Sequence, residues 1–389
     1  MASRDQQYVS DLGEQVALSL IAEDLRFFID FLLDSRLSSI RPIAILALMP
    51  FLSTFVYESG AYVERKGLVS VQDLKPHRSL LLTSRQRVKQ LEDSRRSFEE
   101  LLKSASELAA INNKWMLGLH RGVLAPLKRR LQPELGIFFL HDAVVCTTHV
   151  AFLNLGLTKE ALAASSLSLD NLGPHMMGVT ADFGEYMSLL ALSLGIDIGT
   201  LGAGSEAPVP LIRFRDVKQQ PFYESLARQV APQQTPVCIL LTSILSQVNT
   251  ARFFVALISG RNTLAAFKTK FVSLYHVASS LQKLLNEDRS NRILHPEAAH
   301  RIGAMLGTTS IRRVRKLRSL RNNLVHYAVD EKTTLRLSSD LPLFGLVEAH
   351  SAGKSLTSVA DDVDSGLVQI SDGLRDMLVP NLTPLLEVH

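Results

Sequence analysis

Residues 262–286 carry the pattern that most narrows the folds open to this chain. Apolar side chains recur there after three and then four positions without a break, at Leu264, Phe267, Phe271, Leu274, Ala278, Leu281 and Leu285. This is the spacing of an α-helix that packs one apolar stripe into the seam of a helical bundle. Other helices are needed to cover such a stripe, so the segment predicts a bundle of α-helices.

Helical periodicity also dominates the rest of the chain. Helices are expected at residues 8–37, 83–112, 137–156, 237–259, 295–306 and 357–379. Residues 42–57 are expected to form a buried helix, because this mostly apolar stretch of about 16 residues, interrupted by Pro50, is shorter than the roughly 20 residues that cross a bilayer. A turn-rich loop is expected at residues 171–182, and a β-hairpin at residues 333–346.

The chain has 389 residues, which is long enough for two domains. Residues 202–236 contain five of the 15 prolines and a glutamine-rich patch, which is typical of a linker, with a short helix expected at residues 222–229. We therefore predict an all-α protein with an N-terminal helical domain (residues 1–201) and a C-terminal bundle of four to five helices (residues 237–389).

Composition limits the compartment and the chemistry. Apolar residues make up 46% and charged residues 21%, which predicts a globular chain. Cys146 and Cys238 lie far apart in apolar surroundings and form neither a disulfide framework nor a zinc pattern. The first 15 residues do not resemble a secretory signal, so a cytoplasmic location is expected. The chain has no HExxH, CxxC, GxGxxG, GxxxxGK[ST] or GxSxG motif, so no metal or cofactor is expected.

Residues 311–330, IRRVRKLRSLRNNLVHYAVD, combine a basic run with an ordered set of polar groups. Read as one helix, the segment has an apolar stripe at Val314, Leu317, Leu324 and Ala328. Arg318, Asn322 and His326 lie at i, i+4 and i+8, so their side chains follow one face, and Arg321 lies at its edge. A cation, an amide and an imidazole are thus expected close together.

These groups suit the cleavage of an RNA phosphodiester. The reaction needs a base for the 2′-hydroxyl proton, an acid for the leaving 5′-oxygen and positive charge on the crowded phosphorane. Histidine titrates near neutral pH and can be either base or acid. Arginine offers a fork of donors to phosphate oxygens. The scheme requires no metal. The alternative interpretation is that His326 is an ordinary packed or solvated helix histidine and Arg321 the partner in a surface ion pair.

Positive charge is concentrated in the same segment, although the net charge of the chain is only +4 and its pI is about 9.0. Six cations fall within ten positions: Arg312, Arg313, Arg315, Lys316, Arg318 and Arg321. All except Arg321, which we assign to the reaction itself, are expected to bind the RNA backbone. A solvated helix face is the alternative.

The segment LRSLRNNLVHY resembles the catalytic motif of the HEPN superfamily, R-x(4–6)-H, in which a polar residue, often Asn, follows the Arg. Arg321, Asn322 and His326 match it with four residues between Arg and His. The resemblance covers about the last third of the chain. It implies a small helical bundle, metal-independent endoribonuclease activity, and dimers whose motif helices meet. In some such proteins the helix that corresponds to residues 262–286 adds polar groups, so His276 is a secondary candidate, as is Tyr327.

The leading prediction is therefore a metal-independent endoribonuclease with tRNA or mRNA as substrate. His326 is assigned as the general acid or base, Arg321 as the phosphorane stabiliser and Asn322 as a positioning residue. One histidine per chain does not easily serve as both acid and base, so a homodimer across the motif helices is expected. The resemblance implies a toxin or anti-phage defence effector, controlled by the N-terminal domain and by an inhibitory or activating protein partner.

Two other interpretations remain open from the sequence. The first is a non-catalytic helical module that binds RNA through the cations of residues 312–321 or serves for dimerisation. The second is a membrane-associated helical protein with residues 42–57 in lipid, which the short span and its proline disfavour.

Overall fold

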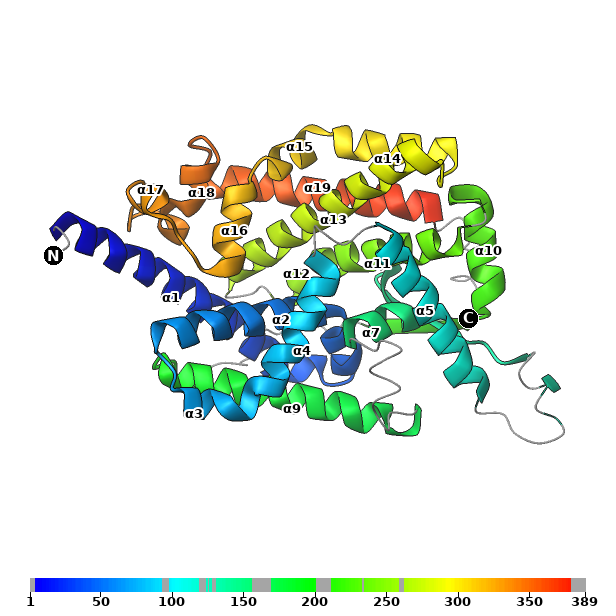
Figure 1. The fold of residues 1–389 in the computed structure, drawn as a ribbon, viewed down its shortest axis with the longest axis horizontal. Coiled ribbons are helices and arrows are strands. Elements are labelled where there is room, and N and C mark those ends of the chain that lie inside the picture. The colour runs from blue at the N-terminus through cyan, green and yellow to red at the C-terminus, as the bar shows by residue number, and fades with distance from the viewer. Residues whose placement is uncertain are drawn as a thin grey trace.

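A computed structural model shows an elongated protein built almost entirely of α-helices (Figure 1). The structure describes residues 4–92, 98–118, 124, 126–127, 131–155, 169–200, 211–232, 234–258 and 262–378. Within this part of the chain the only sheet has three strands. The all-α class predicted from the periodicity is thus confirmed.

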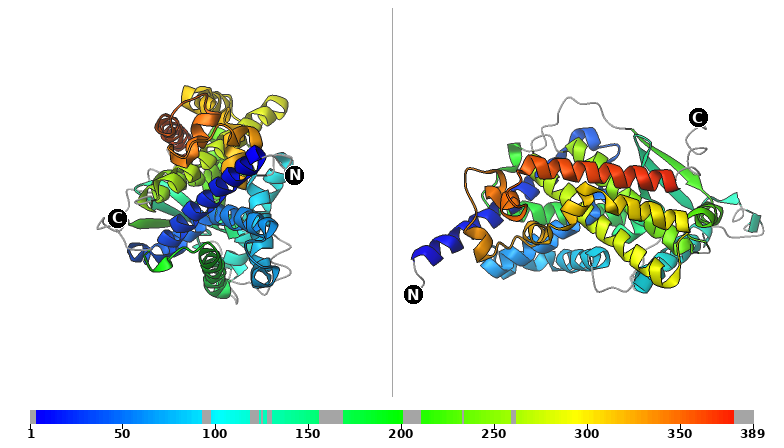
Figure 2. Two further views of the ribbon diagram at one scale, coloured as in Figure 1. Left: turned by 90° about the vertical axis from the view of Figure 1, so that its left-hand side faces the viewer. Right: turned by 90° about the horizontal axis from the view of Figure 1, so that it is seen from above.

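The first part of the chain forms the lower layer in Figure 1. Its helices are α1 (Arg4–Leu33), α2 (Arg41–Lys66), α3 (Val71–Leu74), α4 (Arg78–Glu92), α5 (Phe98–Gly118), α7 (Thr148–Leu155) and α9 (Leu169–Ser193). Short 3-10 turns lie at Ser35–Leu37, Lys75–His77 and Ile198–Thr200. The N-terminal end of α1 extends beyond the other helices at one end of the molecule (Figure 2).

The later helices form the upper layer, with α19 along its outer side (Figures 1 and 2). They are α10 (Gln219–Val230), α11 (Thr235–Asn249), α12 (Val255–Ile258), α13 (Thr263–Asn291), α14 (Pro296–Gly307), α15 (Thr309–Arg315), α16 (Arg318–His326), α17 (Glu331–Thr334), α18 (Leu346–His350) and α19 (Leu356–Leu378). A π-helical turn, Thr250–Phe254, joins α11 to α12. The expected stripe of residues 262–286 lies on α13, which packs against α1, α14, α15, α16 and α19.

Helices α2 and α11 are both long and strongly apolar. In the part of the chain that the structure describes, α2 and the continuous run Thr235–Leu257 are long and apolar enough to cross a membrane. However, 78% and 72% of their most apolar windows are buried inside the protein. Pro50 lies within α2 without ending it. The expected buried helix at residues 42–57 is confirmed as part of this element.

The single helix expected at residues 137–156 is wrong over most of its length. It forms β1 (Leu135–Leu140), β2 (Ala143–Thr147) and only then α7. His141 and Asp142 connect the strands, and both have positive φ angles, 49° and 65°, as a tight two-residue hairpin turn requires. Strands buried on both faces lack alternation, so their short apolar runs look like buried helix in a sequence.

The expected linker is also corrected over much of its length. Ile212–Val217 forms β3, which pairs antiparallel with β1 from Leu135↔Val217 to Leu140↔Ile212 and gives the order β2-β1-β3. The helix expected at residues 222–229 is present as α10, which packs against α11, α14 and α19. One hydrophobic core contains side chains from both sides of this region. Residues 201–210 and 233 lie outside the described part.

Three further expectations differ from the structure. The hairpin expected at residues 333–346 is instead α17, a turn and a 3-10 turn, Pro342–Gly345, because Asp330 caps the new helix by accepting a hydrogen bond from the Thr333 N–H at 2.8 Å. The loop expected at residues 171–182 lies inside α9. The helix expected at residues 83–112 is divided between α4 and α5, with residues 93–97 outside the described part.

A buried polar network holds α7 against α10. His149 places Nε2 2.8 Å from Gln219 Oε1 and Nδ1 3.1 Å from the Tyr223 hydroxyl. Gln219 Oε1 also accepts a hydrogen bond from Asn112 Nδ2 at 2.9 Å. Because a carbonyl oxygen only accepts, His149 donates from Nε2 and accepts the Tyr223 proton at Nδ1. The neutral ring therefore satisfies both of its nitrogen atoms.

This network makes the folded state sensitive to acid. Burial lowers the pKa of His149 from 6.5 to about 4. Between these values the unfolded chain binds a proton that the folded chain does not, so the stability is complete above pH 6.5 and is lost as the pH falls. We expect this group to contribute a slope of about 1.4 kcal/mol per pH unit to the free energy of unfolding, measured by urea denaturation between pH 4 and 7.

The variant His149→Gln should unfold more easily at pH 7 but should have a shallower pH dependence. His300→Gln, which changes an exposed histidine on α14, is the matched control and should leave the slope unchanged. Equal slopes for the parent and His149→Gln would contradict the assignment.

Candidate catalytic site

The motif segment is not one helix, as expected, but two. Helix α15 ends at Arg315 and α16 begins at Arg318, with Leu317 at φ −90° and ψ 42° between them. The break lets the apolar faces meet different partners, since α15 packs against α13 and α19 whereas α16 packs against α2, α13 and α18. Of the expected stripe, Val314 and Leu324 are buried, Leu317 is half-buried and Ala328 is exposed.

Arg321 is the centre of the candidate site. It donates from Nε and Nη2 to His276 Nε2, at 3.0 and 2.7 Å. Its Nη1 donates to Asn322 Oδ1 at 3.2 Å and lies 3.5 Å from His326 Nε2. The structure therefore brings the three motif residues together, with His276 of α13 as a fourth member.

His276 acts here as a hydrogen-bond acceptor. Arginine keeps its proton in proteins and has only donors, so the Nε2 that faces Arg321 carries no hydrogen. Burial, and then the positive charges of Arg321 and His326, lower the pKa of His276 from 6.5 to about 3. The ring is thus neutral near pH 7 and orients the guanidinium rather than exchanging protons.

His326 has a carboxylate partner from a distant helix. Its Nδ1 lies 3.0 Å from Glu58 Oε2 on α2, and the Glu58 side chain is only 11% exposed, whereas that of His326 is 43% exposed. A carboxylate at Nδ1 holds the proton there and leaves Nε2 to exchange protons. That Nε2 is the atom beside Arg321. Glu58 was not predicted, because no local pattern links residues 58 and 326.

A buried ion pair supports the site from behind. Lys268 of α13 pairs with Asp24 of α1, the Tyr327 hydroxyl donates to Asp24 Oδ2 at 2.6 Å, and Lys268 Nζ lies 4.0 Å from the centre of the Tyr327 ring. Burial raises the pKa of Asp24 and lowers that of Lys268, so each depends on the other for its charge. A cavity of about 40 Å³ is lined by all three side chains and by His276.

Tyr327, a secondary candidate, is 1% exposed and so supports the site from within. It terminates α16 in the left-handed conformation, with φ 49°. Burial raises the pKa of Tyr327 far above its usual range, so the hydroxyl keeps the proton that it donates to Asp24.

The cations expected to bind RNA lie on both sides of the helix break. Arg312, Arg313 and Arg315 are on α15, Lys316 is in the connection, and Arg318 begins α16. Four of them are exposed and Arg315 is half-buried. Arg313 pairs with Asp362 of α19 at 3.2 Å. Among the described residues no group of three or more His, Cys, Asp or Glu side chains is arranged to hold a metal.

Comparison of the chain with protein-family models, with curated proteins and with solved structures gives no match. The chemistry of the site is therefore argued from its own geometry. The half-exposed imidazole of His326 has the Glu58 carboxylate at one ring nitrogen and the Arg321 guanidinium at the other. Such a set can accept or donate a proton beside a bound anion.

The buried ion pair predicts a large difference between two lysines of α13. Lys268→Met leaves the Asp24 charge buried without its partner and should lower the free energy of unfolding by about 3–5 kcal/mol. Lys270 pairs with Asp364 at the surface, at 2.9 Å, so Lys270→Met should cost less than about 1 kcal/mol. Urea denaturation at pH 7 measures both. Similar losses in the two variants would contradict the structural role of the pair.

Proposed function

We propose that this protein is a metal-independent endoribonuclease of HEPN type. The observation that carries the proposal is the position of Arg321, whose guanidinium lies within 3.5 Å of His326 Nε2 while its other side is held by His276. A phosphate bound at this point would meet a positive charge and an imidazole together. The tRNA and mRNA pools are the proposed substrates.

In this reaction His326 Nε2, as base, takes the proton of the 2′-hydroxyl, and the 2′-oxygen attacks the phosphorus. Arg321 stabilises the added negative charge, and Asn322 positions the phosphate or the imidazole. The 5′-oxygen then leaves with a proton from an acid, which gives a 2′,3′-cyclic phosphate and a 5′-hydroxyl. Glu58 positions His326 by holding its Nδ1 proton.

The reaction also needs an acid for the leaving 5′-oxygen. We propose that a second copy of the chain provides this group. His326 is 43% exposed at the end of α16, which supports an approach of two motif helices. We further propose a cytoplasmic toxin or anti-phage effector. The contact of α2 with α16 supports control of the site by the N-terminal half, with an inhibitory or activating protein acting through it.

A non-catalytic RNA-binding or dimerisation module is the second candidate. One observation favours it: Nε, Nη1 and Nη2 of Arg321 all contact protein groups, as they do in an arginine that only holds helices together. Exposed Arg312, Lys316 and Arg318 would then bind the RNA backbone. Salt-sensitive RNA binding without cleavage, unaffected by loss of His326, would support this candidate.

The test is incubation of the purified full chain with end-labelled total RNA and tRNA in EDTA. The parent should yield fragments that end in 2′,3′-cyclic phosphate. His326→Ala should reduce cleavage by about 100- to 10,000-fold, because it removes the proton-transfer group. Arg321→Ala should also abolish most cleavage, and Glu58→Gln should reduce it less.

His300→Ala, at an exposed position on α14, is the matched control and should cleave like the parent. Equal cleavage by His326→Ala would show that the site assignment is wrong. If the protein binds RNA but shows no cleavage that is lost in His326→Ala, the nuclease proposal is rejected in favour of the second candidate.

A further inference from the structure

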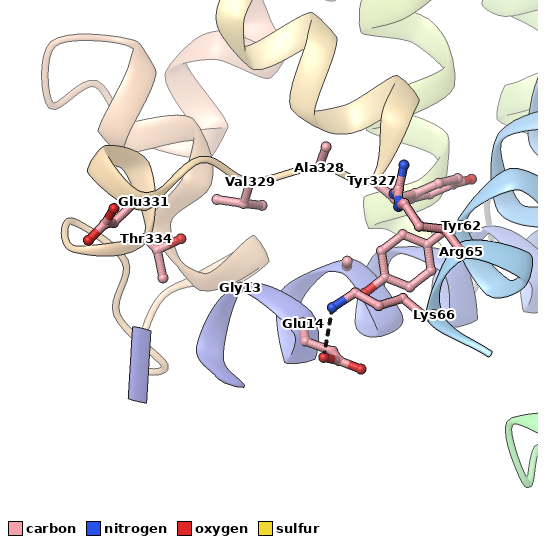
Figure 3. Close-up of a pocket in the computed structure, with 11 residues that line it drawn as sticks. Gly13, Glu14, Tyr62, Arg65, Lys66, Tyr327, Ala328, Val329, Glu331 and Thr334 are labelled. Atoms are coloured by element: carbon pink, nitrogen blue, oxygen red, sulfur yellow. Dashed lines mark hydrogen bonds and ion pairs between the residues drawn. The ribbon is translucent and has the colours of Figure 1, made fainter. Parts of the chain in front are cut away.

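A pocket of about 420 Å³ lies beside the candidate catalytic site, on the other side of Tyr327. It is formed by α1, the C-terminal end of α2, the segment after α16, and α17 (Figure 3). Its volume falls within the range of about 300–1,000 Å³ that is usual for small-molecule sites. Apart from Tyr327, it shares no lining residue with the site described above.

Charge is distributed unevenly around this pocket. Figure 3 shows Arg65 and Lys66 toward one end, with Tyr62, and Glu331 toward the other. Lys66 pairs with Glu14 at 3.0 Å, which balances one of the two cations. Arg65 lies over the Tyr62 ring, 5.5 Å from its centre, and leaves this end of the pocket positive. A ligand with an anionic group at one end and a hydrogen-bond donor at the other would match both ends.

Tyr62 is the second and independent indication of a ligand. Its side chain lines the pocket and the residue is only 3% exposed. Within the part of the chain that the structure describes, its buried hydroxyl has no hydrogen-bond partner. Buried hydroxyl groups in folded proteins nearly always have one. Burial, with the nearby Glu14 carboxylate, raises the pKa of Tyr62 to about 12, so the hydroxyl retains a proton to donate.

We propose that this pocket binds a small phosphorylated molecule of mononucleotide size. The phosphate lies at Arg65 and Lys66 and accepts a hydrogen bond from the Tyr62 hydroxyl. A hydroxyl or amino group at the far end of the ligand donates to Glu331. The proposal is independent of ribonuclease activity, because none of these four side chains belongs to the catalytic arrangement.

The test is isothermal titration calorimetry of the full chain with four probes: adenosine 5′-monophosphate, ribose 5-phosphate, inorganic phosphate and adenosine. The monophosphate should bind most tightly, because it reaches both ends of the pocket. Ribose 5-phosphate should bind more weakly and adenosine weakest of all. No binding of the monophosphate at about 1 mM, or adenosine binding equal to it, would overturn the proposal.

Two substitutions locate the ligand. Tyr62→Phe removes only the unpartnered hydroxyl. It should therefore weaken the binding of the monophosphate while leaving the unliganded protein at least as stable as the parent. Arg65→Glu should weaken binding by about tenfold or more. Arg85→Glu is the matched control, because Arg85 lies over Tyr57 at 6.0 Å in the same kind of contact but does not line the pocket. The affinity of Arg85→Glu for the monophosphate should equal that of the parent.

A nucleotide could also occupy the candidate catalytic site, and Arg321→Ala separates the two locations. The pocket assignment requires that Arg321→Ala leaves the affinity for the monophosphate unchanged while Arg65→Glu lowers it. The reverse pattern, or unchanged binding in both Tyr62→Phe and Arg65→Glu, would overturn the proposal.

Discussion

The ion pair between Asp24 and Lys268 is the interaction on which the arrangement around the site depends. Each charge removed from water costs several kcal/mol unless a partner compensates it. Here the compensation comes from α1, α13 and, through the Tyr327 hydroxyl, the end of α16. Separation of α1 from α13 would leave both charges unpaired, and movement of the end of α16 would take a hydrogen bond from the Asp24 carboxylate. The position of the motif helix is therefore set by electrostatics as well as by apolar packing.

His276 and His326, on either side of Arg321, show how the surroundings give one kind of side chain two different roles. His276 is buried beside a permanent positive charge, so it stays neutral and serves as an acceptor that fixes the direction of Arg321. His326 is half-exposed and has the Glu58 carboxylate at Nδ1. Only His326 is thus placed to exchange protons with a bound anion. Tyr327 follows it directly and lines both the cavity behind the site and the larger pocket beside it.

The success of sequence prediction followed the length and regularity of each element. Helices α13 and α19 were predicted because their apolar stripes persist over several turns, which no strand reproduces. The hairpin at Leu135–Thr147 was missed because short strands buried on both faces show no alternation. Strand β3 was predicted to be part of a linker. Its hydrogen bonds go to β1, more than 70 positions earlier in the chain, so the nearby sequence does not indicate a strand. Pairing at such separations has no local signature.

For the site, the sequence by itself determined the helical class and the local cluster of Arg321, Asn322 and His326, because spacing along one helix decides which side chains are neighbours. Only the tertiary structure decided that the motif segment breaks at Lys316–Leu317, that Glu58 meets His326, and that Asp24 and Lys268 lie behind them. The contacts of Glu58 with His326 and of Asp24 with Lys268 join residues about 240 to 270 positions apart in the sequence. Their formation depends on how apolar faces and buried charges are satisfied together, which is a property of the whole packed chain.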